Sequence, residues 1–94
     1  KDDAAEINDF SWWCFENKIN LDEAYTMAGK GVQIAKPGSE KAQILDTMAE
    51  ICNAKDDCTN AIKLTEQAIK EDPNSKHYKA QLKRFQDLAA KQGK

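Results

Sequence analysis

Few side chains in this 94-residue sequence have the types and spacing that chemistry requires. The cysteines are Cys14, Cys52 and Cys58, and the one histidine is His77. The cysteines lack the paired spacing of a structural zinc site, and His77 is distant from any pair. The histidine has no poised nucleophile, and no Gly-rich phosphate loop is present. We therefore expect no metal, no cofactor and no catalysis within this chain.

Two interpretations of Cys52 and Cys58 stay open. Both fall on inward positions at the facing ends of two predicted helices. In the first interpretation, which we favour, they are small buried hydrophobic residues that replace aromatic ones. In the second, a disulfide between them clamps the hairpin. An unstrained bridge over so short a loop would contribute roughly 2 kcal/mol and would require an oxidising compartment.

Composition excludes several classes of partner. The net charge is −2, with 32% charged and 40% apolar residues, and Lys and Arg are spread among Asp and Glu. Without a basic patch, nucleic acid is not expected as a partner, and without a long apolar run no membrane insertion is expected. The chain begins with Lys1 rather than Met, so we expect a processed or excised piece of a larger protein, in a compartment that the sequence leaves open.

The elements that must position any site are helices. Gly and Pro are scarce, with four and two residues, whereas Ala, Lys, Glu, Gln and Leu are common. This pattern predicts five helices, at residues 3–17, 21–36, 40–54, 58–71 and 75–91. Asn20 with Glu23 has the spacing of a capping box for the second helix, and Ser39 and Asp57 would cap the third and fourth. The short connections predict antiparallel neighbours.

Two helical faces recur along the chain. One face of the second helix recurs in the fourth, 37 residues later, and one face of the first helix recurs in the third, 38 residues later. Small residues return where small residues stood, which predicts two helical hairpins stacked as a solenoid. The first pair of faces is Ala24, Tyr25, Ala28, Gly31 and Val32 with Ala61, Ile62, Thr65, Ala68 and Ile69. The second pair is Ile7, Phe10, Ser11 and Cys14 with Leu45, Met48, Ala49 and Cys52.

The chain resembles the tetratricopeptide repeat family. Residues 42–75 carry the resemblance, through Leu45-x-x-Met48-Ala49-x-x-Cys52, then Ala61-x-x-x-Thr65-x-x-Ala68, and a closing Pro73. The resemblance implies one all-α domain over 1–94, a short solenoid of antiparallel hairpins. Repeat one would span about 4–37, repeat two 42–75, and a capping helix about 75–91. Asp56 stands in the tight turn where the family prefers Gly. Two repeats are fewer than the three usually needed for stability, so we expect the chain to depend on its cap, a neighbouring domain or a second copy.

The resemblance also implies a concave groove, lined by the first helix of each pair, that binds a peptide. Its lining would be acidic and amide-bearing, so a basic or amide-rich peptide is expected, and binding of an acidic C-terminal peptide is rejected because the required Lys is missing. The alternative is a solvated polar face without a ligand. The groove residues would be Asn8, Asp9, Trp12, Glu16, Gln43, Asp46, Thr47, Glu50, Asn53 and Arg84, with Gln81 beside Arg84.

The segment SWWCF, residues 11–15, leaves a further choice. Trp12 lies away from the inward face of the first helix and Trp13 flanks that face. Both tryptophans would pack on the third helix or its edge, or one would contact a partner. The run NDFSWWCFENKINLDEA also resembles the helical tail of some bacterial thioredoxin-like proteins. The alternative function is therefore a structural appendage of such a parent, which packs in cis or dimerises through the first helix. No Cys-x-x-Cys is present, so redox activity would lie outside this piece.

Overall fold

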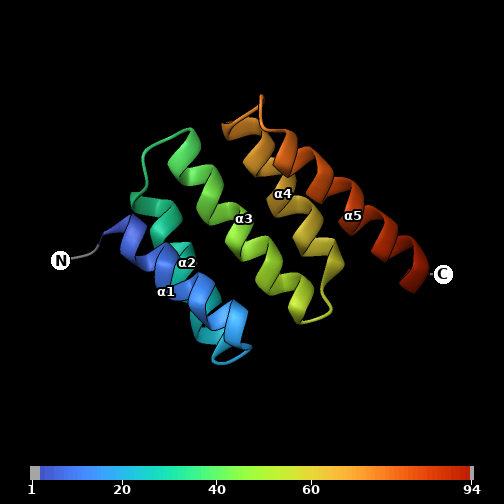
Figure 1. The fold of residues 1–94 in the computed structure, drawn as a ribbon, viewed down its shortest axis with the longest axis horizontal. Coiled ribbons are helices and arrows are strands. Elements are labelled where there is room, and N and C mark those ends of the chain that lie inside the picture. Colours follow the sequence, from blue (N-terminus) through green and yellow to red (C-terminus); the bar gives the residue numbers. More distant parts are fainter. Residues whose placement is uncertain (1–2, 94) are drawn as a thin grey trace.

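Helices account for nearly all of the computed structural model, which describes residues 3–93 (Figure 1). No strand occurs in these residues, so the all-α prediction is confirmed. Every predicted helix is present, and its ends fall within two residues of the prediction. In chain order the helices of this described part are α1 (Ala4–Asn17), α2 (Leu21–Ile34), α3 (Ser39–Ala54), α4 (Cys58–Glu71) and α5 (Lys76–Gly93).

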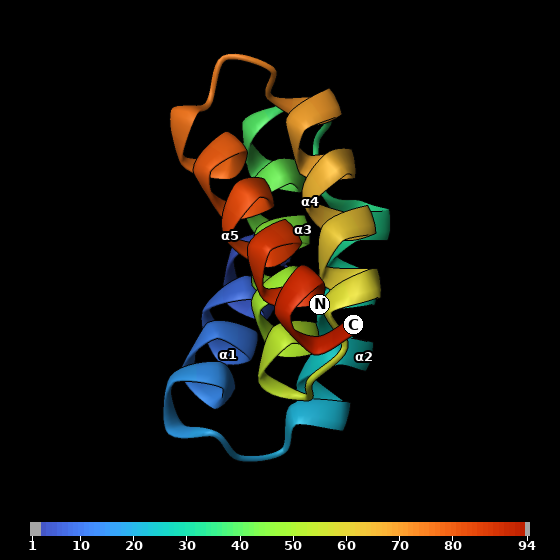
Figure 2. The same cartoon turned by 90° about the vertical axis from the view of Figure 1, so that its right-hand side faces the viewer.

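The helices form two stacked antiparallel hairpins and a final helix. α1 packs on α2 and α3 packs on α4, while α3 also contacts both α1 and α2, and α5 packs against α4. Viewed from the end, α2 and α4 occupy one side of the molecule, and α1 and α5 lie on the other (Figure 2). The stack is long and thin, 45 × 31 × 17 Å. A short solenoid of helical hairpins therefore describes the architecture.

Small residues let the helices approach closely. Gly31 of α2 shows how tight the packing is, because a Cβ atom at this position would lie 3.1 Å from Cγ2 of Ile7 and 3.4 Å from Cδ1 of Ile44. Three helices, α1, α2 and α3, meet at this one residue. The buried positions of α2 recur in α4 at the predicted offset. They are Ala24, Ala28 and Gly31 in α2, and Ala61, Thr65 and Ala68 in α4.

The face of α1 matches that of α3 with one exception. Ile7, Ser11 and Cys14 are buried as predicted, and Ser11 Oγ donates a hydrogen bond of 3.2 Å to the carbonyl oxygen of Ala24. Phe10 is 39% exposed, so its predicted inward position is wrong. Its counterpart Met48 is buried because the first hairpin covers it. Within residues 3–93 no helix covers the corresponding side of α1, which lies at the end of the stack (Figure 1).

Helix caps agree with the sequence only in part. Asp57 caps α4 as predicted, accepting a hydrogen bond of 3.2 Å from the backbone N–H of Asn60. Asp3, predicted as the first helical residue, instead caps α1 by accepting a 2.8 Å bond from the N–H of Ala5. Asp56 adopts the left-handed conformation, with φ 64°, that its turn was expected to need.

Two predicted caps are wrong. Asn20 precedes α2 but has φ 49° and makes no side-chain cap bond, because its left-handed backbone turns the side chain away from the first N–H groups. Ser39 is already helical, and Gly38 takes the capping position with φ 99°, a conformation that suits glycine. The N–H of Gly38 donates to Glu71 Oε1 at 2.9 Å, which ties this connection to the end of α4.

Enlarging a close-approach alanine should destabilise the fold. Ala68 is fully buried between helices, so we expect Ala68→Leu to lower the free energy of unfolding by about 1–3 kcal/mol through overpacking. Ala80→Leu, on the exposed side of α5, is the matched control and should change it by less than about 0.5 kcal/mol. Urea unfolding followed by circular dichroism measures both, and equal effects of the two variants would contradict the close packing of Ala68.

Candidate functional site

One pocket on the side of α1, α3 and α5 gathers half of the predicted groove residues. It is open to solvent and has a volume of about 360 Å³, and we refer to it as the groove pocket. α5 was expected to contribute Arg84 and Gln81, but the residues that it adds to this lining are His77 and Tyr78, which the sequence analysis did not select. Its lining is Asn8 and Trp12 from α1, Gln43, Asp46 and Thr47 from α3, and His77 and Tyr78 from α5.

Trp12 forms the aromatic wall of this pocket. Its ring centroid lies 5.0 Å from that of Phe15, one turn further along α1, with the ring planes tilted by 40°. Trp12 is still 37% exposed, so one part of the indole packs on its own helix and another part faces solvent beside the pocket. A large aromatic surface that is already held in place and still exposed suits contact with a ligand.

Asn8 contributes a buried acceptor. Its Oδ1 atom is shielded from solvent and has no hydrogen-bond partner among the described residues. A buried polar atom without a partner costs about 1–3 kcal/mol, so such atoms are uncommon and a donor brought by a ligand would recover that cost. Asn8 lines the groove pocket as well as a second pocket, of about 300 Å³, beside Ser39 and Gln43.

Glu50 and Arg84 come together as predicted, but they contact each other. Arg84 Nη2 donates to both carboxylate oxygens of Glu50, at 2.9 and 2.8 Å, and Gln81 Nε2 donates to Glu50 as well. The Oε1 atom of Gln81 accepts from Arg84 Nε at 3.0 Å. These bonds join α3 to α5, and they occupy the Glu50 carboxylate within the chain. The matching i, i+4 spacing of acids on α3 and polar residues on α5 is the sequence signal that could have suggested this link.

Asp46 joins the same network at the edge of the groove pocket. Its carboxylate lies 3.4 Å from His77 Nε2 and accepts from Gln81 Nε2 at 3.4 Å. Burial raises the pKa of Asp46 above its ordinary value of 3.8. The Gln81 hydrogen bond and the nearby His77 oppose part of this rise, and the charge of Glu50 adds to it. Ionising Asp46 therefore costs more in the folded chain than in the unfolded one.

The remaining predicted groove residues lie outside the pocket lining. Asp9 and Glu16 are exposed on α1. Asn53 is half-buried at the end of α3, where its Oδ1 lies 3.8 Å from the thiol sulfur of Cys58.

Thr47 lines the pocket but is itself buried, and its hydroxyl donates to the carbonyl oxygen of Gln43 at 3.1 Å.

All three cysteines are buried, and the surroundings of Cys14 and Cys52 disfavour the thiolate. Burial, followed by the charge of Asp57, raises the pKa of Cys52 to about 11. Burial also raises the pKa of Cys14, with a further contribution from Glu23. A thiol with such a pKa stays protonated near neutral pH and is a poor nucleophile. The disulfide between Cys52 and Cys58 stays a prediction.

The described residues offer neither a metal-binding cluster nor a membrane-spanning helix. Residues 3–93 contain no group of three or more His, Cys, Asp or Glu side chains placed to hold a metal ion. None of the helices in this part of the chain has the length and apolar character needed to cross a bilayer.

The stability of the chain should depend on pH through Asp46. Because its pKa is raised on folding, this carboxyl contributes stability that is present at low pH and is lost as the pH rises through the folded pKa. We expect Asp46→Asn to gain stability relative to the natural chain as the pH increases from about 3 to about 7. Urea unfolding across this range measures the difference, with Asp9→Asn as the control for losing one surface carboxylate. A difference that stays constant or falls would contradict the burial of Asp46.

Native Cys52 should alkylate slowly. A pKa of about 11, against an ordinary 9.0, leaves roughly one hundredth of the usual thiolate at about pH 8. Iodoacetamide labelling with peptide mass mapping measures the rate at which Cys52 is alkylated in the folded chain and in the chain unfolded by urea. Equal rates in the two states would contradict the burial of Cys52. If Cys52 and Cys58 both resist labelling in urea without reductant, the disulfide interpretation holds instead.

Comparisons with known proteins do not place the chain. No family model, no curated protein and no solved structure matches it. The likeness to tetratricopeptide repeats therefore depends on the residues and packing described above, and it is taken up as a proposal.

Proposed function

We propose that this chain is a protein–protein interaction module of the tetratricopeptide repeat type, which binds an extended segment of another protein along α1, α3 and α5. One observation carries the proposal. In the groove pocket a partly exposed Trp12 lies beside the buried, unpartnered Oδ1 of Asn8 and the carboxylate of Asp46. One opening thus holds an aromatic surface, a hydrogen-bond acceptor and a carboxylate. This combination is more typical of a peptide-binding surface than of a solvated helix face.

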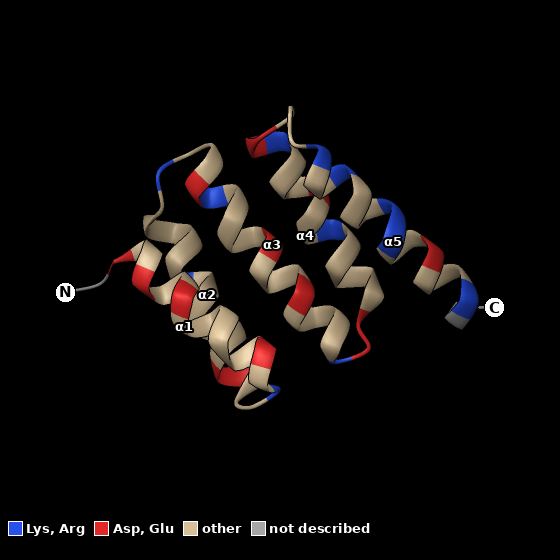
Figure 3. Ribbon diagram, viewed as in Figure 1, with Lys and Arg blue, Asp and Glu red and all other residues tan. Residues whose placement is uncertain are grey.

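The polar groups of the pocket define the chemistry of the ligand. Asn8 Oδ1 needs a donor, which a peptide N–H or a side-chain amide supplies. Asp46 and the exposed Asp9 and Glu16 give this side of α1 and α3 an acidic character, visible as red bands in Figure 3. The charge of Glu50 is already balanced by Arg84. A segment with Lys, Arg, Asn or Gln side chains therefore fits best, and a cationic side chain would also stack on Trp12.

A second function is favoured by a separate observation. Phe10 and Trp13 are 39% and 52% exposed on α1 and lie outside the lining of the groove pocket. Exposed aromatic side chains next to each other on a helix are typical of a contact surface. This observation supports the alternative of a structural appendage that packs on a parent protein, thioredoxin-like or other, or that dimerises.

Peptide binding tests the first function. We expect synthetic 12-residue peptides rich in Lys, Arg, Asn or Gln to change tryptophan emission saturably, and acidic peptides of equal length to have no effect. Trp12→Ala and Asn8→Ala should each weaken binding by about tenfold or more in isothermal titration calorimetry. Trp13→Ala, one position along on the opposite flank, is the matched control and should bind as the natural chain does.

The proposal fails under either of two results. One is the absence of saturable binding by any peptide in the panel. The other is binding that Trp12→Ala and Trp13→Ala weaken equally, since that would place the ligand away from the groove pocket. Circular dichroism of each variant checks that the helices are retained.

A further inference from the structure

Phe10 and Trp13 of α1 are equivalent, in the second hairpin, to two residues of α3 that are buried. A shift of 38 residues along the chain carries Phe10 to Met48 and Trp13 to Ile51. Met48 is 7% exposed and reaches α2, with its methyl carbon 4.0 Å from where a Cβ of Gly29 would lie. Ile51 is fully buried and packs with Cys14 and Ala24 of the first hairpin. The flank of α1 that carries Phe10 and Trp13, here called the N-terminal face, therefore has the composition of a covered surface and lies exposed.

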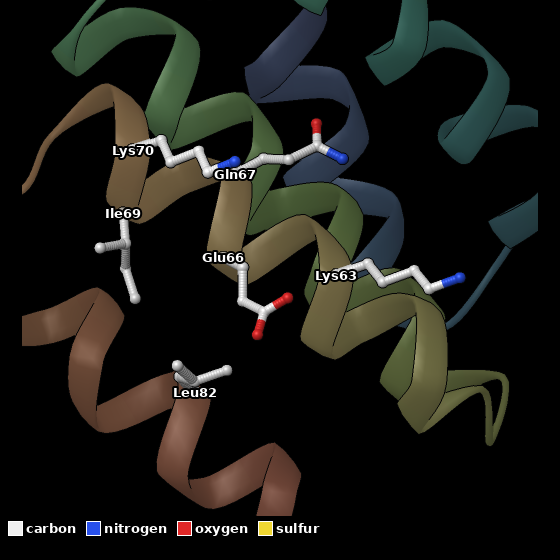
Figure 4. A pocket seen from close by; sticks show the side chains of 6 residues that line it. All are labelled: Lys63, Glu66, Gln67, Ile69, Lys70 and Leu82. Carbon is white, nitrogen blue, oxygen red and sulfur yellow. The ribbon is translucent and has the colours of Figure 1, made fainter.

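The opposite end of the stack has a hollow. It is a shallow surface hollow beside α4 and α5, open to solvent, with a volume of about 640 Å³. Figure 4 shows Ile69 of α4 and Leu82 of α5 pointing into the space between the two helices. Lys63 and Lys70 extend from the side of α4 that is turned away from α5, together with Gln67 (Figure 4). Glu66 of α4 also points into this space beside Leu82 (Figure 4), so the polar lining holds one acid as well as two lysines. The hollow is large enough to take an aromatic side chain.

The two ends also differ in charge. α1 carries Glu6, Asp9 and Glu16 and has no Lys or Arg. α5 carries Lys76, Lys79, Lys83, Arg84 and Lys91 against a single acid, Asp87. Figure 3 shows this difference as red bands on α1 and blue bands along α5. Two copies of α1 placed together would repel each other, whereas the acidic α1 of one copy attracts the lysine-rich α5 that borders the hollow of another.

From these observations we propose that copies of this chain associate head to tail, the N-terminal face of one copy seating Phe10 and Trp13 against the Ile69–Leu82 hollow of the next. Glu6 stands one turn before Phe10 on the same stripe of α1, so it approaches the lysines that line the hollow, Lys63 and Lys70. Such a contact joins two different surfaces, so it builds chains or rings of copies rather than a two-fold dimer. It uses neither Trp12 nor the groove pocket, and it therefore stands or fails independently of the proposed peptide binding.

Complementary variants test the arrangement. The N-terminal face is the head of the proposed contact and the Ile69–Leu82 hollow is its tail. Trp13→Glu disrupts the head, and the double variant Lys63→Glu, Lys70→Glu reverses the lysine charges at the tail without changing a buried residue. We expect the natural chain to exceed its monomer mass of 10.6 kDa in light scattering at about 1 mM, and to dissociate as salt is added. Each variant alone should associate at least about tenfold more weakly. Their equimolar mixture should form a complex of one copy of each, because one intact head meets one intact tail.

Trp12→Glu provides the matched control, since it places the same charge on the other flank of α1 and should associate as the natural chain does. Circular dichroism confirms that each variant keeps its helices. A natural chain that stays monomeric at about 1 mM overturns the proposal, as would be expected if a different protein covers this face. A tail variant that dimerises alone also overturns it, because that result identifies a two-fold contact between N-terminal faces, and so does a mixture that forms no complex.

Discussion

The close approach of helices through small residues is the constraint on which the rest of this structure depends. At Gly31 there is no space for even a methyl group without displacing Ile7 or Ile44, and fully buried alanines hold α2 and α4 in equivalent positions. Side chains this small fix the rotation of each helix about its own axis, since only one stripe can face the neighbouring backbone. Once that stripe is fixed, the two flanks of α1 and of α3 have defined neighbours.

Equivalent flanks of α1 and α3 differ in whether their side chains are bonded within the chain. On the side that faces the next first helix, α1 carries Asn8 and Trp12, and the positions 38 residues later carry Asp46 and Glu50. Asp46 and Glu50 of α3 accept hydrogen bonds from side chains of α5, and these bonds join the last helix to the stack. The residues of α1 are left with an exposed indole and an unpartnered acceptor. One geometry thus yields a structural link at one place and an open pocket at the other.

Much of the fold could be predicted because it is encoded locally. Helix propensity and the recurrence of Ala24, Ala28, Ala61 and Ala68 gave the helices, their order and their inward stripes. The pocket was predicted only in part, because His77 and Tyr78 reach it through the way α5 packs against α4, which no local pattern reports. Phe10 was misplaced for a related reason. Its burial depends on whether another unit lies beyond α1, and the residue type is the same in either case.

The surfaces of this chain depend on the stacking of the two hairpins at Gly31, and nuclear Overhauser spectroscopy on methyl-labelled chain tests that stacking most directly. We expect cross-peaks from the Ile7 Cγ2 and Ile44 Cδ1 methyl groups to the α-protons of Gly31, since both methyl groups border this residue. Cross-peaks from Ile7 alone would show that α1 and α2 form a hairpin without α3 stacked on it. That result, in a chain whose helices are intact, would contradict the solenoid and the surfaces derived from it.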